Sequence, residues 1–153
     1  QVMNIRLREL LREDLGGTYG VGVSVSAERD PDAEYSIAIH FGTAPDRVEE
    51  LTGVVFEEIE RLKTEGPPAE VVQKVREAER RSWETNMKEN RYWLNQLVAA
   101  DRYGLPYDRI LTYPQRIETI TVGMVRDAAK RYLDTANYVK VTLFPETPAA
   151  VVP

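Results

Sequence analysis

The sequence contains no cysteine and only one histidine, His40, among its 153 residues. Without cysteine there is no disulfide, no thiol nucleophile and no cysteine-ligated metal. A single imidazole is too few for an ordinary zinc site, which combines several nitrogen, sulfur or carboxylate ligands. The sequence also has no His-x-x-Glu-His motif and no inverse of it. We therefore expect this chain to hold no metal and to carry no catalytic residue of its own.

Other absences exclude further classes of protein. There is no Gly-x-Ser-x-Gly segment, so nothing supports a serine nucleophile beside His40. The glycines between positions 16 and 22 lead into an expected strand with no following lysine, which excludes a phosphate-binding loop. No apolar run is long enough to cross a membrane. The net charge of −5 argues against a nucleic-acid partner, because such proteins usually present a basic face.

The remaining composition is that of an ordinary globular domain, with 42% hydrophobic and 29% charged residues. A chain of this length corresponds to one domain. We assign residues 1–145 to that domain and residues 146–153 to a C-terminal tail.

Hydrophobic periodicity predicts a helix over 3–15, because its leucines recur at helical spacing. Gly16 then supplies a left-handed helix stop, and Gly16 and Gly17 together permit the turn. Residues 18–27 and 35–42 alternate between apolar and small polar side chains, with a turn cluster at 29–32. These two segments are therefore expected to pair as an antiparallel hairpin.

The second half of the chain is expected to be mainly helical. Thr43 is predicted to cap a helix that runs to about Leu62, and Thr121 to cap another that ends at Leu133. Further helices are expected over 68–86, 90–103 and 107–117, and a last strand over 137–144. The fold class is thus α+β, with helices on one face of a mainly antiparallel sheet. Three strands make a small sheet, so another segment completes it or its edge is open to a second copy, as in a homodimer.

The candidate functional site lies where the first helix ends and the first strand begins. Arg12 is on the last helical turn and Tyr19 at the strand's start, so the geometry brings both to one end of the fold. A guanidinium and a phenol held together there suit a carbonyl or carboxylate. The plainer alternatives are an Arg12 that pairs with Glu9 or the helix dipole, and a Tyr19 that belongs to the core. His40 is expected to be an exposed or hydrogen-bonded side chain on the polar strand face.

The segment 11–21, with its arginine, leucine, glycines and tyrosine, closely resembles a motif of the insulinase/pitrilysin family of zinc metallopeptidases, also called inverzincins. The similarity extends along the chain and is greatest to the C-terminal end of long bacterial pitrilysin-like zinc proteases. It is carried by the order of several weaker segments: 65–71, 90–97, 113–117, 119–121, 132–133 and 137–145. Domains of that family begin with further strands and a helix, so the chain resembles the later part of a domain that is incomplete at its N-terminus.

The resemblance implies a function for the opening motif. One half of such an enzyme binds zinc through an inverted His-x-x-Glu-His helix, and the other half lacks the metal but contributes an arginine and a tyrosine seven residues apart. Arg12 and Tyr19 match that pair in type and spacing. Their implied role is to bind the substrate backbone and to help stabilise the tetrahedral intermediate.

We therefore interpret the chain as a non-catalytic C-terminal domain of a zinc-dependent endopeptidase, inactive alone. Its expected partners are a peptide or protein substrate and a zinc-binding half, in the same polypeptide or in a paired subunit. The resemblance is to exported bacterial proteins, which suggests the periplasm. The alternatives are a structural or scaffolding member of the same superfamily and a peptide-binding module without proteolytic activity.

Overall fold

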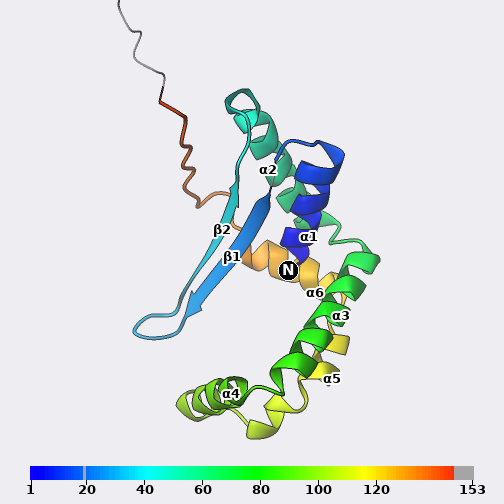
Figure 1. The fold of residues 1–153 in the computed structure, drawn as a ribbon, viewed down its shortest axis with the longest axis vertical. Coiled ribbons are helices and arrows are strands. Elements are labelled where there is room, and N and C mark those ends of the chain that lie inside the picture. Colours follow the sequence, from blue (N-terminus) through cyan, green and yellow to red (C-terminus); the bar gives the residue numbers. More distant parts are fainter. Residues whose placement is uncertain (19, 147–153) are drawn as a thin grey trace, which may run out of the picture.

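The computed structural model describes residues 1–18 and 20–146 of the chain (Figure 1). Residues 147–153, the greater part of the tail assigned above, lie outside the described residues. The elements follow the order α1 (Val2–Arg8), η1 (Glu9–Asp14), β1 (Val21–Glu28), β2 (Glu34–Phe41), η2 (Pro45–Arg47), α2 (Val48–Thr64), α3 (Ala69–Asn86), α4 (Asn90–Arg102), η3 (Tyr107–Ile110), α5 (Tyr113–Glu118) and α6 (Val122–Tyr132).

The two strands form the predicted antiparallel hairpin. Its register runs from Val21 opposite Phe41 to Glu28 opposite Glu34. Because side chains alternate between the faces of a sheet, Val23 and Ile39 share the face that packs on the helices. The opposite face carries small polar residues and His40, which are exposed. This arrangement confirms the α+β class, with the helices on one face of the sheet.

The core lies between that apolar strand face and two helical segments. α1 with η1 contributes Leu7 and Leu11, and α2 contributes Leu51, Val55 and Ile59. The α2 residues recur every three or four positions, which places them on one side of the helix. The predicted helix is therefore confirmed, with one buried side. α6 packs against the same helix and extends the layer (Figure 1).

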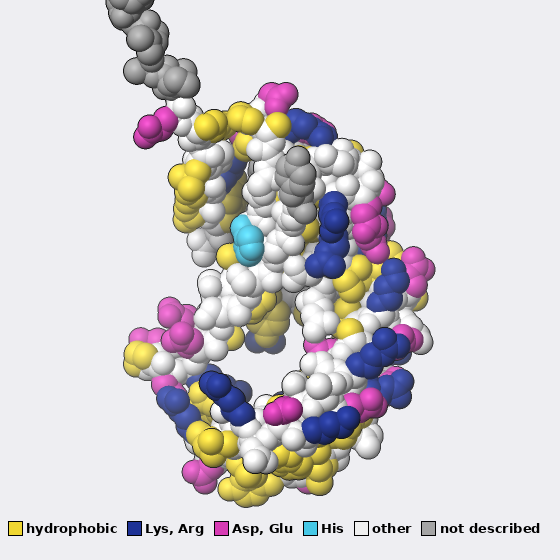
Figure 2. Space-filling view, in the orientation of Figure 1, with side chains coloured by type: hydrophobic (Ala, Val, Ile, Leu, Met, Phe, Trp, Pro, Cys, Tyr) yellow, Lys and Arg dark blue, Asp and Glu magenta, His cyan; other side chains and the backbone are white. Residues whose placement is uncertain are grey.

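The remaining helices form a second lobe. α3 leads away from the sheet, and α5 packs along it, while α4 and η3 lie at the far end (Figure 1). We call this group of α3, α4, η3 and α5 the helical lobe. Its end meets the tip of the hairpin through an exposed ion pair of 3.0 Å between Arg102 and Asp30. An opening remains between the hairpin and the helices (Figure 2).

The prediction of a strand over 137–144 is wrong. The described residues of this segment form no regular element, and within residues 1–18 and 20–146 the sheet has two strands. Its alternating sequence has the composition of a strand, but a strand needs a hydrogen-bonding neighbour, and here neither hairpin edge provides one. The segment is instead held to α2 by a contact of the Tyr138 ring with Phe56 and by an ion pair of 2.6 Å between Lys140 and Glu49.

Helix boundaries also differ in part from the prediction. Thr43 does not cap a helix, because α2 follows a 3-10 turn and the Thr43 hydroxyl donates to the Gly17 carbonyl at 2.7 Å. The Thr121 cap is confirmed, since its hydroxyl accepts from the Met124 amide at 3.2 Å. The helix expected over 107–117 is split into η3 and α5.

Asn4 of α1 occupies the edge of β1. Its side-chain amide donates to the Val23 carbonyl and accepts from the Val23 amide, each at 3.0 Å. A neighbouring strand would make the same pair of bonds, so the Asn4 side chain replaces one residue of a strand at this position. The Val23 backbone is thereby satisfied on the side away from β2.

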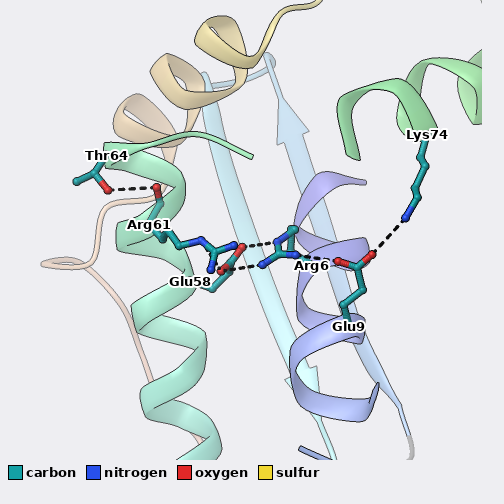
Figure 3. Close-up of polar contacts among 6 residues, drawn as sticks. All are labelled: Arg6, Glu9, Glu58, Arg61, Thr64 and Lys74. Carbon is teal, nitrogen blue, oxygen red and sulfur yellow. Dashed lines mark hydrogen bonds and ion pairs between the residues drawn. The ribbon is translucent and has the colours of Figure 1, made fainter. Parts of the chain in front are cut away.

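A buried ion pair joins the first two helices (Figure 3). Arg6 Nε donates to Glu58 Oε1 at 2.7 Å, and the Glu58 side chain is only 2% exposed. Glu9 accepts from the same guanidinium at 2.8 Å and pairs with Lys74 of α3 at 3.4 Å. The hydrogen bond that Arg6 donates to Glu58 raises the pKa of Arg6, so the guanidinium stays charged. The network therefore links α1, α2 and α3.

We expect Glu58→Gln to lower the free energy of unfolding by about 2–4 kcal/mol, because it leaves Arg6 buried with only part of its compensation. Urea denaturation followed by circular dichroism measures the change. Glu50→Gln is the matched control, since Glu50 lies on the same helix in an exposed pair with Arg47. Equal effects of the two substitutions would contradict a special role for the buried pair.

Candidate functional site

Arg12 lies in η1, the π-helical turn that continues α1. The turn is closed by a bond of 3.2 Å from the Leu15 amide to the Leu10 carbonyl, five residues back. Arg12 is exposed, whereas its neighbour Leu11 is completely buried. The predicted helix to residue 15 thus exists as an α-helix followed by a π-turn. Single π-turns occur frequently at functional sites.

The two glycines after this turn have different structural roles. Gly16 has a φ of +56°, a left-handed conformation that other residues adopt only with strain. The Gly17 amide donates a hydrogen bond to the Leu11 carbonyl at 2.8 Å. A Cβ at Gly17 would lie 2.8 Å from a methyl carbon of Leu51, which is fully buried. The backbone at Gly17 therefore rests directly on the core.

The loop between η1 and β1 is fixed to the start of α2. The Thr43 hydroxyl donates to the Gly17 carbonyl, and Arg47 Nη1 donates to the Leu15 carbonyl at 3.3 Å. The Thr18 hydroxyl lies 2.8 and 2.6 Å from the carbonyl oxygens of Gly20 and Gly42, and its single proton can be donated to either. Both flanks of the loop are thus anchored to one neighbouring segment, 42–47. Sequence reasoning missed the anchoring roles of Thr18, Thr43 and Arg47, because their partners lie far away in the chain.

Tyr19 lies outside the described residues. Its predicted partnership with Arg12 stays a prediction. Among the described residues, Arg12 has neither an ion pair nor a side-chain hydrogen bond, so its alternative pairing with Glu9 is not formed. Glu9 instead accepts from Arg6 and pairs with Lys74. No described residue therefore competes with a ligand for the Arg12 guanidinium.

His40 lies on the polar face of the hairpin and is exposed, as predicted (cyan in Figure 2). A Cβ placed on Gly22, its partner across the hairpin, would come within 2.3 Å of the imidazole Nε2. The ring therefore lies over Gly22, a position that a larger residue would obstruct.

No metal site is formed by residues 1–18 and 20–146, where no three His, Asp or Glu side chains gather closely enough to hold an ion. In the same residues no helix combines the length and the apolar character needed to cross a membrane. The chemistry that this site offers is hydrogen-bond donation from an exposed guanidinium beside an anchored turn. Such a group suits carbonyl and carboxylate oxygens.

We expect Gly17→Ala to destabilise the fold by about 1–3 kcal/mol, because the added methyl group must displace the buried Leu51 side chain. Gly16→Ala, which strains the backbone at positive φ, should cost about 1 kcal/mol. Gly20→Ala is the control, since a Cβ there meets nothing within 4 Å. Urea titrations of the three variants would refute this explanation if Gly20→Ala were the most destabilising.

Several solved structures share this fold. The periplasmic protease PqqL from Escherichia coli superimposes with a TM-score of 0.68 at 22% identity, over 86% of this chain and 15% of that one. A peptidase M16 inactive domain from Pseudomonas fluorescens gives 0.69 at 22% identity, over 84% of this chain and 30% of that one. The ferredoxin protease FusC, in complex with Arabidopsis ferredoxin, gives a TM-score of 0.61 at 24% identity, over 86% of this chain and 14% of that one.

Sequence comparison assigns the family. A "Zinc protease PQQL-like" protein of Arabidopsis thaliana is 31% identical over an alignment of 105 residues that covers 65% of this chain and 11% of the relative. The chain thus spans about a tenth of that relative's length. The family model described as "Peptidase M16 inactive domain" matches residues 1–79, just over half of the chain. The chain therefore belongs to the family of peptidase M16 inactive domains.

Proposed function

We propose that this chain acts as the substrate-binding, non-catalytic domain of a zinc-dependent endopeptidase, with Arg12 and Tyr19 as its substrate contacts. The observation that carries the proposal is the exposed Arg12 on a π-turn whose following loop is fixed to the core. The family assignment and the zinc-protease relative support the enzyme context.

The physical basis is hydrogen-bond donation to oxygen atoms whose charge rises during peptide hydrolysis. A guanidinium carries several N–H donors and a phenol carries one. Donors held at a fixed place stabilise a developing oxyanion without having to reorganise. The anchored loop would supply this fixed placement.

The zinc chemistry has to come from elsewhere. The described residues contain no set of ligands that fits a zinc ion, so we assign zinc binding to a partner half, in the same polypeptide or in a paired subunit. The proposed substrates are peptides or proteins, and the proposed compartment is the bacterial periplasm. The solved structure of a periplasmic protease supports the proposed compartment. The structure of a protease in complex with ferredoxin supports a protein substrate.

The exposed apolar residues after α6 support contact with such a partner. Val139, Val141 and Leu143 are 89%, 79% and 91% exposed. They alternate along a segment with strand composition, and neither edge of the hairpin is paired with another strand in the described part of the chain. We propose that another sheet edge, from the partner half or from a second copy of this chain, covers this segment.

In the full-length polypeptide that carries this chain, Arg12→Ala should lower kcat/KM for a peptide roughly tenfold to a hundredfold, because a charged donor to the substrate is lost. Tyr19→Phe should lower it about tenfold. Zinc content should stay unchanged in both variants. Steady-state peptidase assays together with metal analysis measure these effects.

Arg81→Ala is the matched control, since the Arg81 side chain is 81% exposed on α3, away from the loop. It should cleave peptides normally. Normal cleavage by Arg12→Ala and Tyr19→Phe would disprove the assigned roles. An inactive wild-type polypeptide would instead favour the scaffolding function.

For the isolated chain, we expect self-association that Val139→Lys and Val141→Lys each reduce, because a charge on the exposed segment opposes pairing. Light scattering coupled to size-exclusion chromatography reports the mass. Gln73→Lys, an exposed position on α3, adds the same charge elsewhere and should leave the mass unchanged. A strictly monomeric wild-type chain would exclude the homodimer.

A further inference from the structure

The helical lobe contains a cavity of about 350 Å³, whose lining includes neither Arg12 nor any residue of the two strands. Its walls come from α3, α4, η3 and α5, the group at the far end of Figure 1. Sites for small ligands and side chains are usually concave, largely apolar and supplied with a few polar groups. We call this space the lobe cavity.

One wall of the lobe cavity contains an arginine with an unused donor. The Nε of Arg116 is buried and has no hydrogen-bond acceptor among the described residues. The Nη2 of Arg116 donates to the Arg109 carbonyl at 3.3 Å, which leaves a second N–H on that nitrogen. The guanidinium lies over the Tyr113 ring, with its central carbon 5.3 Å from the ring centroid. It is therefore held in place while part of its hydrogen-bonding capacity is free.

The carboxylate that lines the cavity does not neutralise Arg116. Glu79 Oε2 accepts from the Tyr113 hydroxyl at 2.8 Å, and Glu79 Oε1 accepts from the side chain of Gln1. Burial and the bond to Glu79 raise the pKa of Tyr113 to about 12, so its hydroxyl remains a donor. Arg109 adds a second positive charge to the wall. The lining groups thus carry a surplus of positive charge.

The rest of the wall suits an organic group. Trp83 and Tyr92 line the cavity, together with the buried Ile110. The Trp83 indole donates to the Ile110 carbonyl at 3.1 Å, which fixes the ring as part of the wall. Both rings thus face this space. Asn86 and Gln96 supply amides that can bond to a peptide backbone.

We propose that the lobe cavity binds a peptide carboxylate next to an apolar side chain, with Arg116 as its charged anchor. A carboxylate oxygen would accept from the remaining N–H of Arg116 Nη2, forming a charge-assisted bond that the chain does not supply. The adjacent apolar side chain would pack against Trp83 and Tyr92. The carboxylate belongs either to the C-terminus of the peptide or to an acidic side chain, because both offer the same pair of oxygens.

Fluorescence anisotropy with labelled peptides tests the proposal on the full-length polypeptide, with a zinc chelator present to prevent cleavage. Three peptides share one neutral sequence that ends in phenylalanine. The first has a free C-terminal carboxylate, the second a C-terminal amide, and the third an amide with a glutamate before the phenylalanine. The first should bind about tenfold tighter than the second, since one bond to a charged group is gained. Binding of the third distinguishes a side-chain carboxylate from a chain terminus.

Arg116→Gln should abolish the preference for the carboxylate, whereas Arg81→Gln, on an exposed face of α3, should keep it. Equal binding of all three peptides to the wild-type protein would overturn the proposal. The same holds if Arg116→Gln retains the preference. Should Arg116→Gln fail to fold, Ala99→Phe provides a second test, because it fills the cavity and leaves Arg116 in place. Unchanged peptide binding by Ala99→Phe would also overturn the proposal.

Carboxylate binding by Arg116 is independent of the role proposed for Arg12. Arg116→Gln should leave kcat/KM unchanged for a neutral peptide with an amide terminus, whereas Arg12→Ala should lower it. The kinetic assay of Arg12→Ala and the binding assay of Arg116→Gln can therefore fail independently, and each failure contradicts only one of the two roles.

Discussion

The buried pair of Arg6 and Glu58 is the constraint on which the arrangement depends. A carboxylate removed from water on the inner side of α2 requires a compensating cation. Arg6 of α1 makes the shorter contact, at 2.7 Å, and Arg61 of α2 itself lies at 3.5 Å. This requirement fixes the rotation of α1 against α2 and places Leu7 and Leu11 in the core. Since η1 continues α1, the same contact determines where Arg12 emerges at the surface. Glu9 extends the network to Lys74, so the base of the helical lobe is tied to the same centre.

The hairpin and helix α2 could be predicted because each has a local pattern, which alternates along the strands and recurs every three or four residues along the helix. The segment after α6 has an equally strong alternating pattern but lacks a partner, and strand formation depends on a neighbour that the pattern does not contain. Thr43 illustrates the same limit, because its position resembles a cap while its hydroxyl bonds to Gly17 across the fold.

The candidate site could likewise be predicted only in part. Arg12 lies at the end of the first helix, where spacing places it, and it is exposed. The features that hold the loop come from the distant segment 42–47 and from the contact of Gly17 with Leu51, neither of which leaves a local signal. The lobe cavity was missed for a related reason. Trp83 and Tyr92 lie on two different helices, and whether their rings enclose a cavity depends on how four elements meet.

The bonds from Asn4 to Val23 have a consequence for how the sheet can grow. A strand that approached β1 from its free side would have to displace this amide before it could pair through the middle of β1. The described part of β2 carries no such block along its outer edge. An added strand is thus directed to the outer edge of β2. A single side chain in the first helical turn, Asn4, gives the molecule a preferred direction of assembly.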